Sequence, residues 1–345
     1  MFRMTYMHIC KSDSKRIMPF QLPAISMRLL IILLILWIPS STAFLSLYIT
    51  DTILHPSSRT NTALSSIQKR NNNNNNSNNV LLTQVISDVD DTLKSSGGVT
   101  VAGVALGGID VQYERGDFYP GVAQFMLELS LRQSDGTVVT DTPPPKVAIL
   151  TARAEEFKVA LELKETSKLA IAFREAGEEM NIANWGLGPV LYGSVAEWIV
   201  QNRKGLRKFS NFERLLQQDP TGTILQYIYV GDTGELDQEA AETMLREYPQ
   251  VVKAVFLHVV SDLPNPEVPT PKLINGRPIL FFRTYVGAAT MATQLQFMDE
   301  QGLQRVIAAA VAKLTAVPKT SDKWIDLNRD LNYAYRTLQM DPAER

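Results

Sequence analysis

An apolar segment that stops abruptly in acidic residues constrains the fold of this chain more than any other feature. Leu81, Leu82, Val85 and Ile86 lead directly into the sequence Ser87-Asp88-Val89-Asp90-Asp91-Thr92. A short continuous apolar run bounded by turn residues is typical of a strand buried on both faces of a parallel sheet. The pattern therefore predicts a central strand whose carboxyl end presents carboxylates.

Other apolar runs predict more strands of the same kind, at 147–150, 188–191, 225–230 and 252–259. Helical patterns at 123–131, 154–176 and 209–217 alternate with them, and patterns at 288–297 and 303–314 predict a helical C-terminal extension. This alternation predicts an α/β fold with a mainly parallel sheet and helices on both faces.

Three of the predicted strands end in polar residues: Asp88 and Asp90, Thr151, and Asp232 with Asp237. In open parallel sheets, ligands bind just beyond the carboxyl ends of the strands. We therefore expect one site that gathers these side chains.

Asp88 is the expected nucleophile, because a carboxylate that attacks phosphorus forms an acyl phosphate that water can hydrolyse. Asp90 emerges on the same side of the strand two residues later and is the expected general acid and base. Crowded carboxylates would repel a phosphate unless a hard cation lay between them, which predicts Mg²⁺. Its expected ligands are Asp88, the Asp90 carbonyl and Asp232, with Asp237 binding directly or through water.

Thr92, Thr151 and Lys208 are the expected phosphate-binding residues, because hydroxyl groups and an ammonium stabilise charge on a transferring phosphoryl group. Thr151 has the alternative role of a helix cap, and Lys204 and Arg207 are rivals of Lys208. His258 lies within an apolar run and is expected to be a core histidine.

The order of these motifs resembles that of the haloacid dehalogenase-like phosphatases: Asp88-Val89-Asp90-Asp91-Thr92, Leu150-Thr151-Ala152-Arg153, Lys208, and Gly231-Asp232 followed by Asp237. The flanking sequences narrow the resemblance to the catalytic domain of actin-patch-type phosphatidate phosphatases, which are related to the lipins: Ile86 to Lys94, Tyr119-Pro120-Gly121-Val122, and Val230 to Asp237. The resemblance spans about residues 80–290 and implies a Rossmann-like catalytic domain. The segment between Thr92 and Phe118 is too short for a large cap domain.

The resemblance implies Mg²⁺-dependent hydrolysis of phosphatidic acid, a membrane lipid, to diacylglycerol and phosphate through a phosphorylated aspartate. Two alternatives remain open: hydrolysis of a soluble phosphomonoester or phosphoprotein by the same chemistry, and non-catalytic binding of phosphatidic acid. The formal net charge of −2 predicts no nucleic-acid partner. The sequence does not indicate which proteins, if any, bind this one.

The N-terminal region is predicted to contain a targeting sequence followed by a linker. An apolar run at 29–38, preceded by Arg28 and followed by small residues up to Ala43, predicts a signal peptide or signal anchor over 1–43. The Ala43-Phe44 junction also resembles algal plastid presequences, so the expected destination is the secretory pathway or a plastid, with membrane anchoring as an alternative. Residues 44–79 are rich in Asn and Ser and predict a disordered linker. The catalytic domain is then expected over 80–285, and the helical extension over 286–345.

Overall fold

The computed structural model describes residues 82–98, 100–101, 104–105, 108–132, 143–154, 165–193, 204–219, 224–234, 236–263 and 266–339. The predicted signal segment and linker lie outside these residues. All described residues fall within one unit, Asn61–Arg345. None of the helices formed by the described residues combines the length and the apolar content needed to cross a bilayer.

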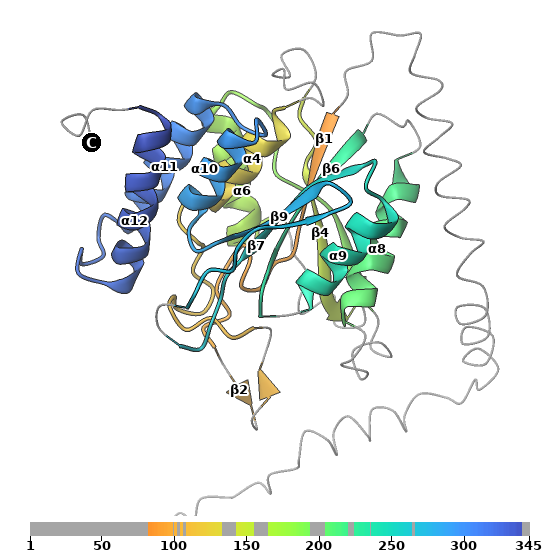
Figure 1. The fold of residues 1–345 in the computed structure, drawn as a ribbon, viewed down its shortest axis with the longest axis horizontal. Helices are drawn as coiled ribbons and strands as arrows, with labels where there is room; N and C mark the ends of the chain where they lie inside the picture. Colours follow the sequence, from red (N-terminus) through yellow and green to blue (C-terminus); the bar gives the residue numbers. More distant parts are fainter. Residues whose placement is uncertain are drawn as a thin grey trace, which may run out of the picture. The chain divides into compact units, whose positions relative to one another are not determined.

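A seven-stranded sheet forms the centre of this unit, with the strand order β5-β4-β1-β6-β7-β9-β8 (Figure 1). All neighbouring pairs are parallel except the antiparallel pair β8–β9 at one edge. The strands are β1 (Leu82–Ser87), β4 (Val147–Ala154), β5 (Leu187–Gly193), β6 (Ile224–Asp232), β7 (Val252–His258), β8 (Lys272–Ile274) and β9 (Arg277–Phe282). The predicted α/β class and mainly parallel sheet are confirmed.

Successive residues of the central strands supply two separate hydrophobic cores, because side chains alternate between the faces of a strand. On β1, Val85 belongs to one core and Ile86 to the other, and neither side chain is exposed to solvent. On β4, Ile149 and Leu150 divide in the same way. Burial on both faces explains why these strands read as unbroken apolar runs in the sequence.

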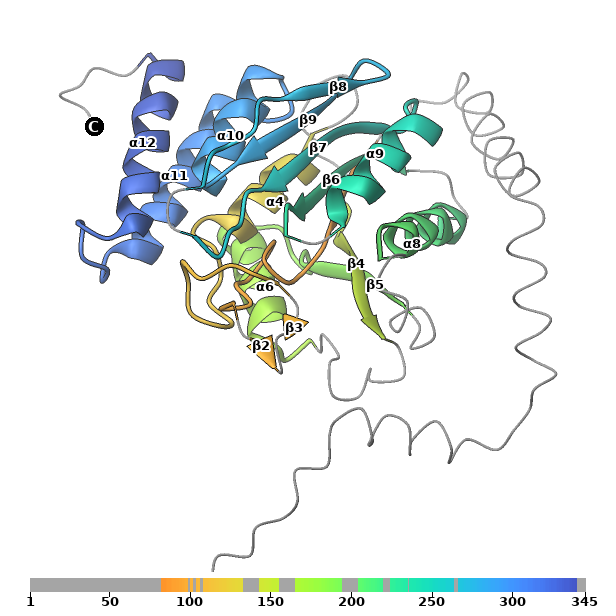
Figure 2. The ribbon, with the colours of Figure 1, turned by 60° about the horizontal axis from the view of Figure 1, so that its bottom comes forward.

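Helices cover both faces of the sheet (Figures 1 and 2). One face carries α4 (Val122–Ser130), α6 (Lys168–Glu179) and α10 (Tyr285–Gln294), with α11 (Glu300–Leu314) and α12 (Asp322–Thr337) packed outside α10. The other face carries α8 (Lys204–Gln218) and α9 (Asp237–Glu247). A small hairpin of β2 (Thr100–Val101) and β3 (Val104–Ala105) lies beyond the carboxyl ends of the central strands.

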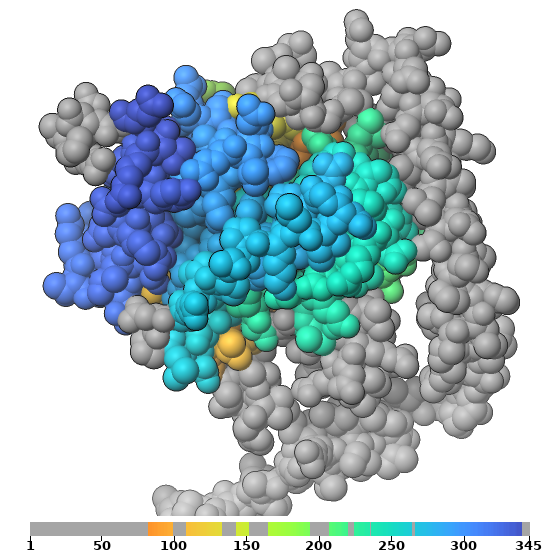
Figure 3. Space-filling model, in the orientation of Figure 1, coloured from red at the N-terminus to blue at the C-terminus, as the bar shows by residue number. Residues whose placement is uncertain are grey.

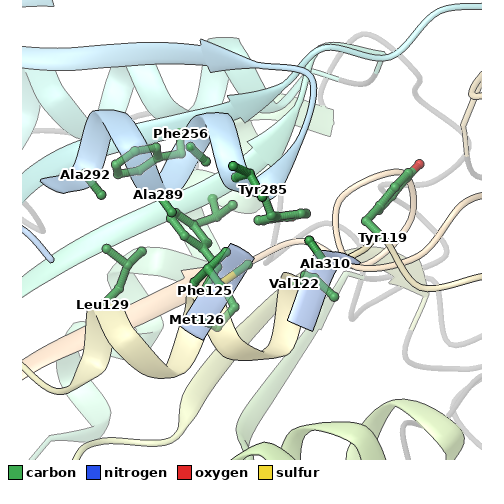
Figure 4. Packing of buried hydrophobic residues seen from close by; sticks show 14 of the residues in the cluster. Tyr119, Val122, Phe125, Met126, Leu129, Phe256, Tyr285, Ala289, Ala292 and Ala310 are labelled. Atoms are coloured by element: carbon green, nitrogen blue, oxygen red, sulfur yellow. The ribbon is translucent and has the colours of Figure 1, made fainter. Parts of the chain in front are cut away.

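Phe125 of α4 lies at the centre of the larger core, where its ring meets the edge of the Phe256 ring from β7 at a centroid distance of 5.5 Å (Figure 4). The Tyr285 ring, at the start of α10, lies 5.3 Å from Phe125 by the same measure. Edge-to-face pairs of this kind add about 0.5–1.5 kcal/mol to the free energy gained from burial. The core therefore joins the sheet, α4 and α10 into one packed body.

The C-terminal helices form part of the same core. Leu303, Trp324 and Leu327 are buried in the cluster that also contains Phe125. Side-chain caps define the helix starts, since Thr284 accepts a hydrogen bond from Gly287 N and Asp299 accepts one from Gly302 N. In the space-filling view, α11 and α12 form a continuous surface with α10 (Figure 3).

Most predicted elements are present, and the differences are as follows. Of the expected helix over 154–176, residue Ala154 belongs to β4, residues 155–164 lie outside the described part of the chain, and α6 begins at Lys168 after its N-cap Ser167. The sequence patterns do not predict α9 or β8, and α12 falls within the expected helical extension over 286–345 without a separate helical pattern of its own. The helix expected after the Tyr119-Pro120-Gly121-Val122 turn is confirmed, and it begins at Val122.

Candidate functional site

The first carboxylate of the site stands where β1 ends. The Asp88 amide continues the sheet pairing by donating to Val230 O at 3.1 Å, and the chain then turns tightly, with Leu93 N donating to Val89 O at 2.9 Å. Asp88 is 3% exposed. The apolar strand thus delivers the Asp88 carboxyl group to a largely dehydrated position at the edge of the sheet.

Asp232 ends β6, the strand that pairs with β1, and is fully buried. Its Oδ1 accepts a hydrogen bond from Gly234 N at 2.6 Å, and its own amide donates to Asp237 Oδ2 at 3.2 Å. A side chain at Gly231 would overlap Asp237, since a Cβ there would lie 2.6 Å from Asp237 Oδ2. The Gly-Asp sequence therefore permits the close approach of the next carboxylate.

Asp88, Asp232 and Asp237 form one buried cluster, in which one carboxylate oxygen of each lies within 4.8 Å of the others. Lys208 of α8 also reaches this cluster. Its Nζ lies 3.1 Å from Asp88 Oδ1 and also donates a hydrogen bond to Asp237 Oδ1. Four charged side chains thus meet at the carboxyl edge of the sheet: Asp88 follows β1, Asp232 ends β6, Asp237 begins α9 and Lys208 comes from α8.

The cluster suits a hard divalent cation. Its ligand atoms are all carboxylate oxygens, which Mg²⁺ prefers. Among the contacts seen between described residues, three carboxylates meet one ammonium, and one divalent cation would offset the remaining two formal negative charges. A buried excess of charge is strongly unfavourable unless it is paired or holds a metal. A buried cluster able to hold a metal ion is therefore present.

Within this cluster, Asp237 contacts two of its neighbours. Both oxygens of Asp237 already accept hydrogen bonds, one from Lys208 and one from the Asp232 amide. These contacts suit Asp237 to orient Lys208 and Asp232 in the site.

The other residues predicted for the site differ in burial and in their contacts. Thr92 is fully buried, and its Oγ1 has no hydrogen-bond partner among the described residues. Thr151 is also buried, but it lies within β4, so it does not cap a helix among the described residues. Asp90 is half-buried and is not among the residues of the carboxylate cluster. Lys208 is 1% exposed, and of the predicted basic residues it is the one whose contacts to the carboxylates are seen.

Two buried titratable groups beside the cluster escaped the sequence reasoning. Tyr229 of β6 is 1% exposed, and its hydroxyl has no hydrogen-bond partner among the described residues. Burial, and then the nearby Asp237 charge, raise the pKa of Tyr229 well above its ordinary value. Burial likewise raises the pKa of the Asp91 carboxyl, although hydrogen bonds from backbone amides oppose this change. In the sequence, Tyr229 lies within an apolar run, so the pattern does not distinguish it from the other core residues of that strand.

His258 is a core residue, as expected. Its Nδ1 lies 2.8 Å from Asp91 O and its Nε2 lies 3.2 Å from Arg283 O, within an aromatic group that includes Tyr119 and Phe282. Burial lowers the pKa of His258 to about 4, so the ring is neutral near pH 7. We therefore assign it no role in proton transfer.

Comparison of the chain with protein-family models, curated proteins and solved structures finds no significant match.

Proposed function

We propose that this protein is a Mg²⁺-dependent phosphatase of the haloacid dehalogenase type, with Asp88 as the nucleophile. The observation that carries the proposal is the buried group of Asp88, Asp232 and Asp237, into which Lys208 projects. A solvated turn or a simple helix cap would not require three carboxylates to be buried together. Buried charges concentrated in this way are typical of catalytic or metal sites.

In the proposed reaction, a carboxylate oxygen of Asp88 attacks the phosphorus atom of a phosphate ester. Asp90 protonates the departing alkoxide, which leaves phosphorylated Asp88 and ionised Asp90. Asp90 then removes a proton from a water molecule that attacks the same phosphorus, so that phosphate is released and Asp88 is restored. Asp88 and Asp232 would hold Mg²⁺, which would offset the charge of the phosphoryl oxygens.

Lys208 has two tasks in this scheme. Its ammonium group lies 3.1 Å from Asp88 Oδ1, which favours the ionised and therefore nucleophilic carboxylate. The same ammonium can approach the phosphoryl oxygens, because it already lies beside the attacking atom. Asp237 limits the movement of Lys208 by accepting its hydrogen bond from the other side.

We propose phosphatidic acid as the substrate. The support comes from the sequence motifs around Asp88, Tyr119 and Asp232, which resemble those of actin-patch-type phosphatidate phosphatases. In keeping with this, the named strands among the described residues between Thr92 and Phe118 are the two short strands β2 and β3, and this segment is too short to form a large cap domain.

The test is phosphate release by the full-length protein from phosphatidic acid in detergent micelles, with and without Mg²⁺, beside a soluble phosphate ester. Asp88→Asn should abolish release, whereas Asp117→Asn, which makes the same change in a nearby loop, should retain it. Activity on the soluble ester alone would keep the chemistry and reject the lipid. Substantial activity of Asp88→Asn would refute the nucleophile, and no activity on any phosphate ester would favour a lipid-binding role.

A further inference from the structure

Asp91, the residue after the predicted acid and base, makes contacts that the proposed chemistry does not use. Its side chain is fully buried, and its carboxylate accepts three backbone hydrogen bonds. Ser96 N donates to Oδ1 at 2.7 Å, whereas Ile109 N and Asp110 N donate to Oδ2 at 2.6 and 2.9 Å. One carboxylate thus joins the turn after β1 to a segment that lies 17 to 19 residues further along the chain.

Contacts of the backbone around Asp91 fix the direction in which its carboxylate points, towards residues 108–110. Asp91 adopts a left-handed conformation with φ of 58°, which Asp tolerates better than most residues. Its carbonyl contacts His258 Nδ1 at 2.8 Å, and the next carbonyl, that of Thr92, accepts a hydrogen bond from the Tyr285 hydroxyl at 2.7 Å. Side chains from β7 and α10 therefore fix the peptide groups on which the Asp91 side chain depends.

The facing segment, residues 108–110, is shaped to receive the Asp91 carboxylate. A Cβ built on Gly108 would lie only 2.0 Å from Asp91 Oδ2, so any side chain there would displace the carboxylate. Glycine is therefore required for the close approach that lets both following amides reach the same oxygen.

Residues 108–110 in turn contact the loop that orients Asp232. A Cβ on Gly234 would lie 2.9 Å from Cγ1 of Ile109, which places the Ile109 side chain directly against this glycine. Gly234 N donates to Asp232 Oδ1 at 2.6 Å. A continuous path of contacts therefore runs from Asp91 through Ile109 and Gly234 to a carboxylate of the metal-binding cluster.

We propose that Asp91 is a positioning residue, which holds the 108–110 segment against the Gly234 turn and thereby sets the orientation of the Asp232 carboxylate for metal binding. The inference deepens the proposed function, because it assigns a residue to the same site. Its metal-binding part does not depend on which substrate is hydrolysed.

The test is binding of Mn²⁺, measured by electron paramagnetic resonance, to the full-length protein and its Asp91→Asn variant. Mn²⁺ accepts the same oxygen ligands as Mg²⁺. Asn has nearly the same shape, but its amide nitrogen cannot accept a hydrogen bond, so at least one of the three backbone amides loses its acceptor. Loss of a group hydrogen-bonded to a metal ligand weakens metal binding about 10- to 100-fold in other sites. Asp91 acts on Asp232 through the 108–110 segment, so we expect a loss at the lower end of this range, about tenfold. Asp117→Asn is the matched control and should bind Mn²⁺ as the unmodified protein does.

Ile109→Ala provides a second test if Asp91→Asn does not fold. It keeps the backbone hydrogen bonds to Asp91 and removes the side-chain contact with Gly234, so Mn²⁺ affinity should also fall, by a smaller factor. In an active protein, Asp91→Asn should also raise the Mg²⁺ concentration needed for half-maximal rate while leaving KM for substrate within about twofold. The inference is overturned if Mn²⁺ affinity is unchanged in a folded Asp91→Asn variant or in Ile109→Ala. It is also overturned if the unmodified protein does not bind Mn²⁺. Tight Mn²⁺ binding without phosphatase activity would support it and count against the proposed function instead.

Discussion

Replacing Asp232 with Asn should make the metal-free protein more stable and should remove its stabilisation by Mg²⁺. Carboxylate oxygens of Asp88, Asp232 and Asp237 lie within 4.8 Å of one another. Two like charges at that separation repel each other by about 3.5 kcal/mol at an effective dielectric constant of 20. Among the described residues of the cluster, two carboxylates repel Asp232 and one ammonium attracts it, so removing the charge of Asp232 relieves a repulsion equal to about one such pair.

Relaxation and water penetration reduce this figure, and we expect a gain of about 1–3 kcal/mol in the free energy of unfolding. The Asn oxygen can still accept the hydrogen bond from Gly234 N, so the turn is preserved. For a domain of this size, each kcal/mol raises the melting temperature by about 2–4 °C. Conversely, Mg²⁺ at 100 times its dissociation constant should stabilise the unmodified protein by about 2.7 kcal/mol and the variant much less.

The assay is thermal unfolding of the full-length protein followed by scanning calorimetry, first with a chelator and then with Mg²⁺. Asp117→Asn serves as the control, because it removes one carboxylate outside the cluster and should alter neither curve. The reasoning is refuted if Asp232→Asn melts below the unmodified protein in the chelator. It is equally refuted if Mg²⁺ stabilises both proteins to the same extent.

Three further predictions concern the core. The pKa of His258 is about 4 in the folded state and near 6.5 in the unfolded state, so the unfolded state binds more protons between these two values. The free energy of unfolding should therefore fall as the pH drops from 6.5 towards 4. In urea unfolding over that range, a His258→Gln variant should show a shallower decline. Asp326→Ala removes the ion-pair partner that lies 3.1 Å from buried Arg283, and should lower the free energy of unfolding by about 3–5 kcal/mol in urea. As a control, Asp262→Ala at an exposed site should lower it by less than about 0.5 kcal/mol. Phe125→Ala removes a fully buried ring and should cost about 3–5 kcal/mol in the same assay, and a cost below about 1 kcal/mol would contradict its central place in the core.

The parts of the fold that could be predicted from the sequence are those in which one local pattern decides the structure. The central parallel strands are buried on both faces, so their apolar runs are long and unbroken, and the sequence predicts β1, β4, β6 and β7. The missed helix α9 buries mostly small or flexible residues, including Ala240, Ala241 and Met244, and presents a weak apolar pattern. Charged residues interrupt the buried positions of α12 in the same way, from Trp324 to Ala334.

The candidate site could be predicted only as far as its residue types. Strand ends placed Asp88 and Asp232 at one edge, because paired parallel strands deliver their carboxyl ends together. The sequence could not separate Lys208 from Lys204, since residues four apart share one face of a helix. The role inferred for Asp91 depends on amides far along the chain, and no local pattern in the sequence indicates such contacts.

Direct detection of phosphorylated Asp88 tests the central claim most directly. The full-length protein would be mixed with phosphatidic acid and Mg²⁺, quenched in acid during turnover, digested, and examined by mass spectrometry. The account predicts one added phosphoryl group on the peptide that contains Asp88, lost on treatment with hydroxylamine and absent from Asp88→Asn. Phosphate release during turnover with no modified Asp88, or with the modification on another residue, would contradict it.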